Sequence, residues 1–164
     1  MTEANLLEAL LDSWDRNNKI QLGLLRDLPE GGLEAKAIGS EASVGQVLSH
    51  ICYIRLVHTF EDAPEHSTFV PQEEWAKEND RGRLAQLLAE SAATVRKAVK
   101  QRLLDGRQMD LHYDHPLLMI QNLLWHEGYH YGQIKLALKQ SGIPITDDQD
   151  AGQLPWIIWM DKTA

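Results

Sequence analysis

The sequence is poor in cysteine, in signal-peptide features and in long apolar runs, and each shortage excludes a class of protein. The single cysteine, Cys52, rules out an intrachain disulfide and is compatible with a reducing compartment. No stretch approaches the ~18 apolar residues that a membrane-spanning helix needs. The first residues carry acids where a secretory signal needs bases. These shortages predict a soluble, cytoplasmic protein.

Basic residues are also scarce, because 24 acidic residues stand against 16 basic ones and the net charge is −8. A nucleic-acid partner or an anionic membrane selects for a positive surface, so we expect neither as a partner. The hydrophobic fraction of 43% is ordinary for a globular protein. A chain of 164 residues can bury a core without staples, which predicts one domain over residues 1–164.

Apolar residues recur with the helical period in four segments, and no segment reads convincingly as a strand. The predicted helices cover residues 3–28, 43–61, 80–105 and 116–141. Ser43 and Gln46 have the spacing of a capping box, and Gly142 suits a helix C-cap. The pattern predicts an all-α protein with the architecture of a four-helix bundle.

Two segments lie outside these helices and still bear on the fold. Residues 62–79 form a long irregular link, and links of this length often border a functional site. The C-terminal tail contains Trp156 and Trp159, which we expect to pack the tail onto the bundle as a short helix or turn.

The last predicted helix carries two histidines four residues apart, His126 and His130. This spacing corresponds to a rotation of about 40°, so both imidazoles leave the same face, which is otherwise apolar. His50 lies mid-helix on the apolar side of residues 43–61 and is the best candidate for a third ligand. Three neutral imidazoles bind a divalent ion and leave coordination positions open. The alternative is a metal-free bundle with hydrogen-bonded core histidines.

Three polar residues are further site candidates, each with a structural alternative. Glu127 completes a formal H-E-x-x-H, but no later glutamate or strand supports a peptidase. It is a candidate general base or a carboxylate that supports a metal ligand. The alternative is that it forms a salt bridge at the surface or the bundle edge. Gln133 could hold a ligand ring or cap a carbonyl group. Asn18 is a polar residue within the apolar stripe of the first predicted helix. Either its amide binds substrate or supports a metal ligand, or the predicted helix register is displaced by one residue.

Two stretches, SVGQVLSHI at 43–51 and HEGYHYGQIKLALKQSGIP at 126–144, resemble the DinB/YfiT-like superfamily. The resemblance covers nearly the whole chain, and H-x-x-x-H-x-G-Q is its most specific part. It implies a four-helix bundle of up-down-down-up connectivity that is often a homodimer. It also implies His50, His126 and His130 as ligands of a divalent ion, commonly zinc or nickel.

The resemblance implies a class of chemistry as well. Characterised relatives include S-transferases and isomerases that use a low-molecular-weight thiol such as bacillithiol or mycothiol. We therefore expect a metal-dependent thiol S-transferase acting on a small-molecule substrate, with Arg55 or the basic residues of 96–102 as candidate contacts for thiol carboxylates. The alternatives are a metal-dependent hydrolase assisted by Glu127 and a non-catalytic metal-binding stress-response module.

Overall fold

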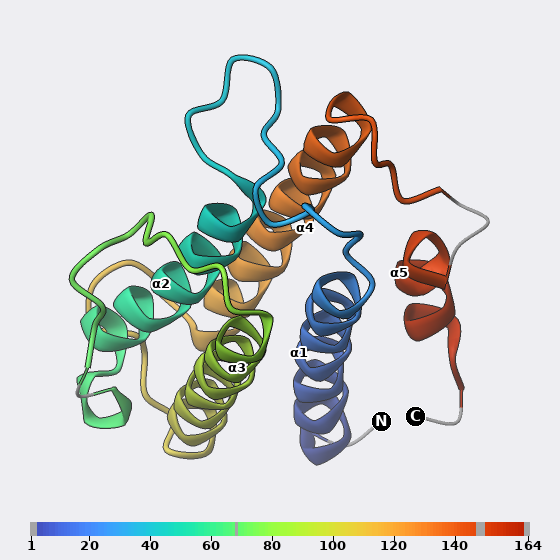
Figure 1. The fold of residues 1–164 in the computed structure, drawn as a ribbon. Helices are drawn as coiled ribbons and strands as arrows, with labels where there is room; N and C mark the ends of the chain where they lie inside the picture. Colours follow the sequence, from blue (N-terminus) through green and yellow to red (C-terminus); the bar gives the residue numbers. More distant parts are fainter. Residues whose placement is uncertain (1–2, 68, 147–149, 163–164) are drawn as a thin grey trace.

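The computed structural model describes residues 3–67, 69–146 and 150–162, and these residues form helices joined by irregular segments (Figure 1). The helices are α1 (Glu3–Arg26), α2 (Val44–Asp62), α3 (Arg81–Leu104), α4 (Pro116–Gln140) and α5 (Asp150–Met160), with a short 3-10 helix, η1 (Pro64–His66), after α2. No strand occurs within these ranges, where β pairing is limited to an isolated bridge between Lys36 and Ser43. The prediction of an all-α fold is confirmed.

The predicted helix boundaries agree with the structure to within two residues. The capping box of α2 is present, since the Ser43 hydroxyl accepts the N–H of Gln46 and the Gln46 side chain accepts the N–H of Ser43. Gly142 has a φ of 77° beyond the end of α4, in the left-handed region that favours glycine. The prediction for α1 was two residues too long, because Pro29 disfavours helical geometry in the residue before it.

The first four helices run up, down, down and up, so α2 and α4 are antiparallel neighbours (Figure 1). This connectivity is the one that the resemblance implies. It places the middle of α2 against the middle of α4, where their inward side chains meet. No helix in the described part of the chain is both long and apolar enough to cross a membrane.

Two apolar clusters form the core, and a polar layer lies between them. One cluster includes Leu48 and Ile134, and the other includes Trp14 and Leu123. Between these two clusters the side chains that point into the bundle are polar. Arg55 and Glu127 are the fully buried residues of this polar layer. The polar layer therefore lies at the height of the histidines on α4.

The C-terminal helix α5 packs along α1, as Figure 1 shows. The guanidinium of Arg16 donates hydrogen bonds to the backbone carbonyls of Ile158 and Asp161. The prediction of a helical tail against the bundle is correct, but its tryptophans are not the anchors, because Trp156 and Trp159 are 63% and 44% exposed. The tail is held instead by Arg16, which binds the backbone carbonyls at the C-terminal end of α5.

Cys52 lies in the first apolar cluster and is buried. Burial raises the pKa of its thiol to about 11. The side chain is therefore a neutral, hydrophobic core group.

Candidate metal centre

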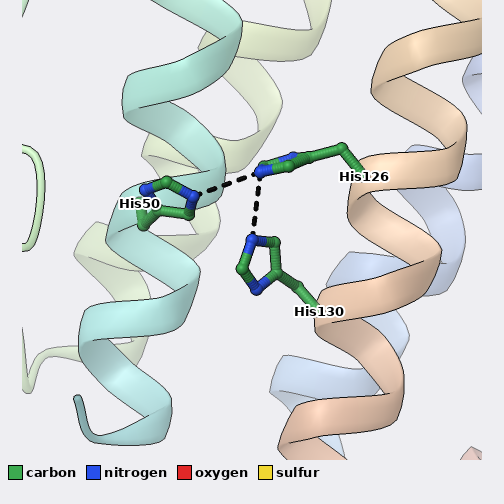
Figure 2. A group of neighbouring side chains, drawn as sticks. All are labelled: His50, His126 and His130. Atoms are coloured by element: carbon green, nitrogen blue, oxygen red, sulfur yellow. Dashed lines mark hydrogen bonds between the residues drawn. The ribbon is translucent and has the colours of Figure 1, made fainter. Parts of the chain in front are cut away.

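Three histidines converge between α2 and α4 (Figure 2). His50 comes from α2, and His126 and His130 come from successive turns of α4. The Nε2 atom of His126 lies 3.1 Å from Nε2 of His50 and 3.0 Å from Nε2 of His130. The antiparallel packing of α2 and α4 thus brings together the three side chains that the sequence suggested as ligands.

The three imidazoles are neutral at physiological pH. Burial, together with the neighbouring histidines, lowers the pKa of His50 and of His126 to about 4. Burial likewise lowers the pKa of His130, opposed by its hydrogen bond with Gln133. Metal ligation requires neutral imidazole, so the environment already holds the rings in the required protonation state.

The outer nitrogens of two rings face oxygen acceptors. Nδ1 of His130 lies 2.7 Å from the side-chain oxygen of Gln133, whose amide nitrogen donates to the hydroxyl of Tyr129. Nδ1 of His50 lies 3.0 Å from a carboxylate oxygen of Glu74. The hydrogen bond with Gln133 favours a proton on Nδ1 of His130, so Nε2 of that ring is left as a bare lone pair. The contact of His50 with Glu74 lacks hydrogen-bond geometry and does not fix the tautomer of that ring.

The close approach of the three Nε2 atoms tests whether the site fits a metal ion. Nε2 of His50 and Nε2 of His130 both point at Nε2 of His126, which carries at most one proton. A single proton cannot serve two short contacts well. An ion bonded to all three nitrogens serves each of them, and zinc–imidazole bonds of about 2.0–2.1 Å suit nitrogens this close together. The three residues therefore fit a divalent ion, and imidazole donors suit zinc, nickel, copper and iron.

The sequence was then compared with known proteins. A model of the DinB family matches residues 1–151. The chain belongs to the DinB family. No curated protein and no solved structure matches it. The family match and the three-histidine cluster together support a metal-binding DinB protein.

The link between α2 and α3 covers the histidine cluster of this DinB-family chain. The indole of Trp75 stacks on the ring of His50, with centroids 4.0 Å apart and planes 1° from parallel. Glu74, beside it, faces Nδ1 of the same ring. Sequence reasoning missed both residues, because an irregular link has no period from which a direction can be inferred. The length of the link was the available signal.

Glu127 lies beneath the histidines in a buried ion pair with Arg55. Two hydrogen bonds of 2.7 and 2.6 Å join the guanidinium to both carboxylate oxygens, and neither side chain is exposed. Asn17 donates a further hydrogen bond to Glu127, and Arg55 lies over the ring of Trp14. The salt bridge that we expected at the surface or bundle edge is thus in the core. The angular position of Glu127 on its helix could be predicted from the sequence, but its partner on another helix could not.

Asn18 belongs to the same network. Its side-chain oxygen accepts a hydrogen bond from Arg55, 3.0 Å away. The polar interruption in the α1 stripe therefore faces a buried guanidinium. Since Arg55 is fully buried and paired, it does not offer a surface for thiol carboxylates.

The basic residues near the end of α3 form ion pairs of their own. Arg102 is almost completely buried and pairs with Asp110 and Glu65. Arg96 pairs with Asp15, and Lys100 lies 3.6 Å from Glu8. The sequence suggested the basic residues of 96–102 as contacts for thiol carboxylates, but Arg102 is instead buried and paired with acidic residues from links outside α3.

Proposed function

We propose that this DinB-family protein is a metal-dependent S-transferase that joins a low-molecular-weight thiol to a small electrophilic substrate. The observation that carries the proposal is the convergence of three Nε2 atoms, from His50, His126 and His130. Three protein ligands leave coordination positions for a small molecule. A bound zinc or nickel ion supplies Lewis acidity, which lowers the pKa of a thiol or water in such a position.

The chain's own residues prepare this site in three ways. Gln133 fixes the orientation and tautomer of His130 through a hydrogen bond, and the carboxylate of Glu74 lies 3.0 Å from Nδ1 of His50. Trp75 covers one face of the His50 ring and excludes water there. His126 is partly exposed, so the cluster has one side in contact with solvent.

The transferred sulfur belongs to the added thiol, because the protein's own thiol is buried. In the reaction a sulfur–carbon bond forms, the bond from that carbon to its leaving group breaks, and the thiol proton leaves with the leaving group or to solvent. Low-molecular-weight thiols are kept reduced in the cytoplasm, which is where we place the enzyme.

The second candidate is a metal-dependent hydrolase, in which water takes the place of the thiol. The burial of Glu127 favours the transferase over this reading. Both oxygens of Glu127 are bound by Arg55, so its carboxylate does not serve as a general base for water. The third candidate, a non-catalytic metal-binding module, shares the metal site and differs in having no turnover.

The first experiment measures metal content. Purified protein is analysed for bound metals beside His50→Ala, His130→Ala and the control His115→Asn, which replaces an exposed histidine and retains a side chain that can cap α4. We expect zinc or nickel bound by the wild-type triad to be lost in both alanine variants and retained in His115→Asn. A triad that takes up no metal even after reconstitution overturns the proposal.

The second experiment measures turnover. Metal-loaded protein is incubated with an electrophile such as a haloarene, with and without bacillithiol, mycothiol, glutathione or coenzyme A, and products are identified by mass spectrometry. We expect a thioether product that requires both thiol and protein and is lost in His130→Ala. Hydrolysis of an ester or amide panel without thiol indicates the hydrolase, and metal binding without either reaction indicates the non-catalytic module.

A further inference from the structure

A second cluster of metal-ligand side chains lies at the far end of α2. His58, Asp62 and His112 place a ligand atom each within 4.8 Å of one another. His58 and Asp62 are four residues apart and share a face of α2, while His112 comes from the connection between α3 and α4. The rings of His58 and His112 are 5.3 Å apart between centroids, and Nδ1 of His112 lies 2.9 Å from Oδ2 of Asp62.

Asp62 is the centre of this cluster and is completely buried. Its Oδ1 accepts the backbone N–H groups of Leu111 and His112, at 3.0 and 2.7 Å, which fixes the carboxylate. Its other oxygen, Oδ2, is left to face the imidazole of His112. Among the residues that the structure describes, no lysine or arginine forms an ion pair with Asp62.

A buried carboxylate without a permanent cation is costly. The Arg55–Glu127 pair shows how this chain offsets the same cost elsewhere, with a guanidinium bonded to both oxygens. Within the described residues, the cationic candidate bonded to Asp62 is one titratable imidazole, that of His112. A divalent ion supplies the positive charge that the site lacks.

The neighbouring side chains prepare His58 and His112 for ligation. The hydroxyl of Tyr113 lies 2.6 Å from Nδ1 of His58 and accepts a hydrogen bond from Asn122, so it fixes the orientation of the ring. In the tautomer in which Nδ1 donates to that hydroxyl, Nε2 carries the lone pair that a metal ion needs. The side chain of His112 is 41% exposed, which gives an ion access from solvent. Glu61 lies 3.8 Å from Nδ1 of His112 and offers a further oxygen.

We propose that His58, Asp62 and His112 bind a second divalent transition-metal ion, separate from the three-histidine centre. Two imidazoles and one carboxylate are a donor set that zinc and ferrous iron accept readily. His50 and His58 are eight residues apart, which is a rise of about 12 Å along the helix, so the two sites are separate mononuclear sites. The second ion joins the α3–α4 connection to the end of α2.

The experiment counts bound ions by site. Chelator-treated protein is dialysed against zinc and analysed for zinc per chain, beside His112→Ala, His58→Gln, His50→Ala and the double variant His50→Ala/His112→Ala. We expect two equivalents in the wild type, one in each single variant and none in the double variant. Circular dichroism checks that each variant retains its helical content.

The matched control is His115→Asn, three residues along the same connection, which should retain two equivalents. One equivalent in the wild type that His112→Ala and His58→Gln both retain overturns the proposal, as do two equivalents that both variants retain. A failure of the three-histidine centre gives a different result. In that case His50→Ala binds as much zinc as the wild type, while His112→Ala loses the zinc equivalent of the second site.

Discussion

At the scale of single residues, the polar layer is organised by one charge pair. Arg55 and Glu127 are fully buried and joined by two short hydrogen bonds. A buried ion pair is a weak source of net stability, but removing one partner leaves an uncompensated charge in the core. The pair links α2 to α4 directly beside the turn that carries His126 and His130, so it also fixes the relative position of the ligands.

We expect Glu127→Ala to lower the free energy of unfolding by about 3–5 kcal/mol, because Arg55 remains buried without its partner. The double variant Arg55→Met/Glu127→Leu should recover most of this loss, since it removes both charges and keeps the volume. Urea unfolding of the metal-free proteins measures both values. A single variant as stable as the wild type would contradict the burial of the pair.

Protonation of the histidine cluster gives a second prediction at this scale. The pKa of His50 and of His126 is lowered to about 4 in the folded protein, against 6.5 for an ordinary histidine. Between these values the unfolded chain binds more protons than the folded one. The free energy of unfolding of metal-free protein should therefore fall as the pH is lowered from about 6.5 towards 4.

Urea titrations of chelator-treated protein at several pH values measure this slope. The matched variant His50→Gln/His126→Gln lacks the two titrating rings and should lose less stability over the same range. Equal slopes for the two proteins would show that these rings do not titrate below their usual pKa.

At the scale of elements, the helices and the direction of their histidines were predictable, whereas the surroundings of the histidines were not. A 3.6-residue period and a capping box are local signals, so α2 and α4 could be placed to within two residues. The opposing partner of Glu127 and the covering residues Glu74 and Trp75 depend on tertiary packing. Local periodicity carries no information about such long-range contacts.

The start of α2 shows how the covering link is tied to the bundle. A Cβ atom at Gly45 would lie 2.6 Å from the carbonyl oxygen of Glu78, which is backbone in the link that carries Trp75. At Gly128, on α4, a Cβ atom would meet nothing within 4 Å. Gly45 is therefore a position where the close approach of another backbone segment leaves no room for a side chain. Gly128 has room for one.

We expect Gly45→Ala to lower the free energy of unfolding by about 1–3 kcal/mol, because the link must move to admit the methyl group. Gly128→Ala is the matched control and should raise it by about 0.5–1 kcal/mol through helix propensity. Thermal or urea unfolding measures both. A Gly45→Ala variant that gains stability as Gly128→Ala does would show that the link does not approach α2 this closely.

At the scale of the whole molecule, α4 presents apolar side chains to solvent as well as histidines to the core. Trp125 and Tyr129 are 75% and 56% exposed, and Leu118 and Leu136 extend the same row. Exposed apolar patches of this kind mark interaction sites. The resemblance to the DinB/YfiT-like superfamily implies a homodimer, and this row is a surface that a second copy could cover.

We expect light scattering to give about twice the 18.6 kDa mass of one chain. Trp125→Arg should shift the mass towards the monomer, because a charge would be buried in the contact. Leu111→Arg is the control, since Leu111 is 68% exposed and lies in the α3–α4 connection. A monomeric mass for the wild type at the highest attainable concentration would rule out the homodimer.

The burial of Cys52 bears on how the protein tolerates the electrophilic substrates that we propose for it. An electrophile that alkylates sulfur finds no accessible cysteine on the described surface, since the only thiol of the chain is buried and its pKa is raised to about 11. A disulfide form of the low-molecular-weight thiol likewise finds no partner for exchange. Alkylation of cysteine and thiol–disulfide exchange are therefore not routes by which the proposed substrates inactivate the folded protein.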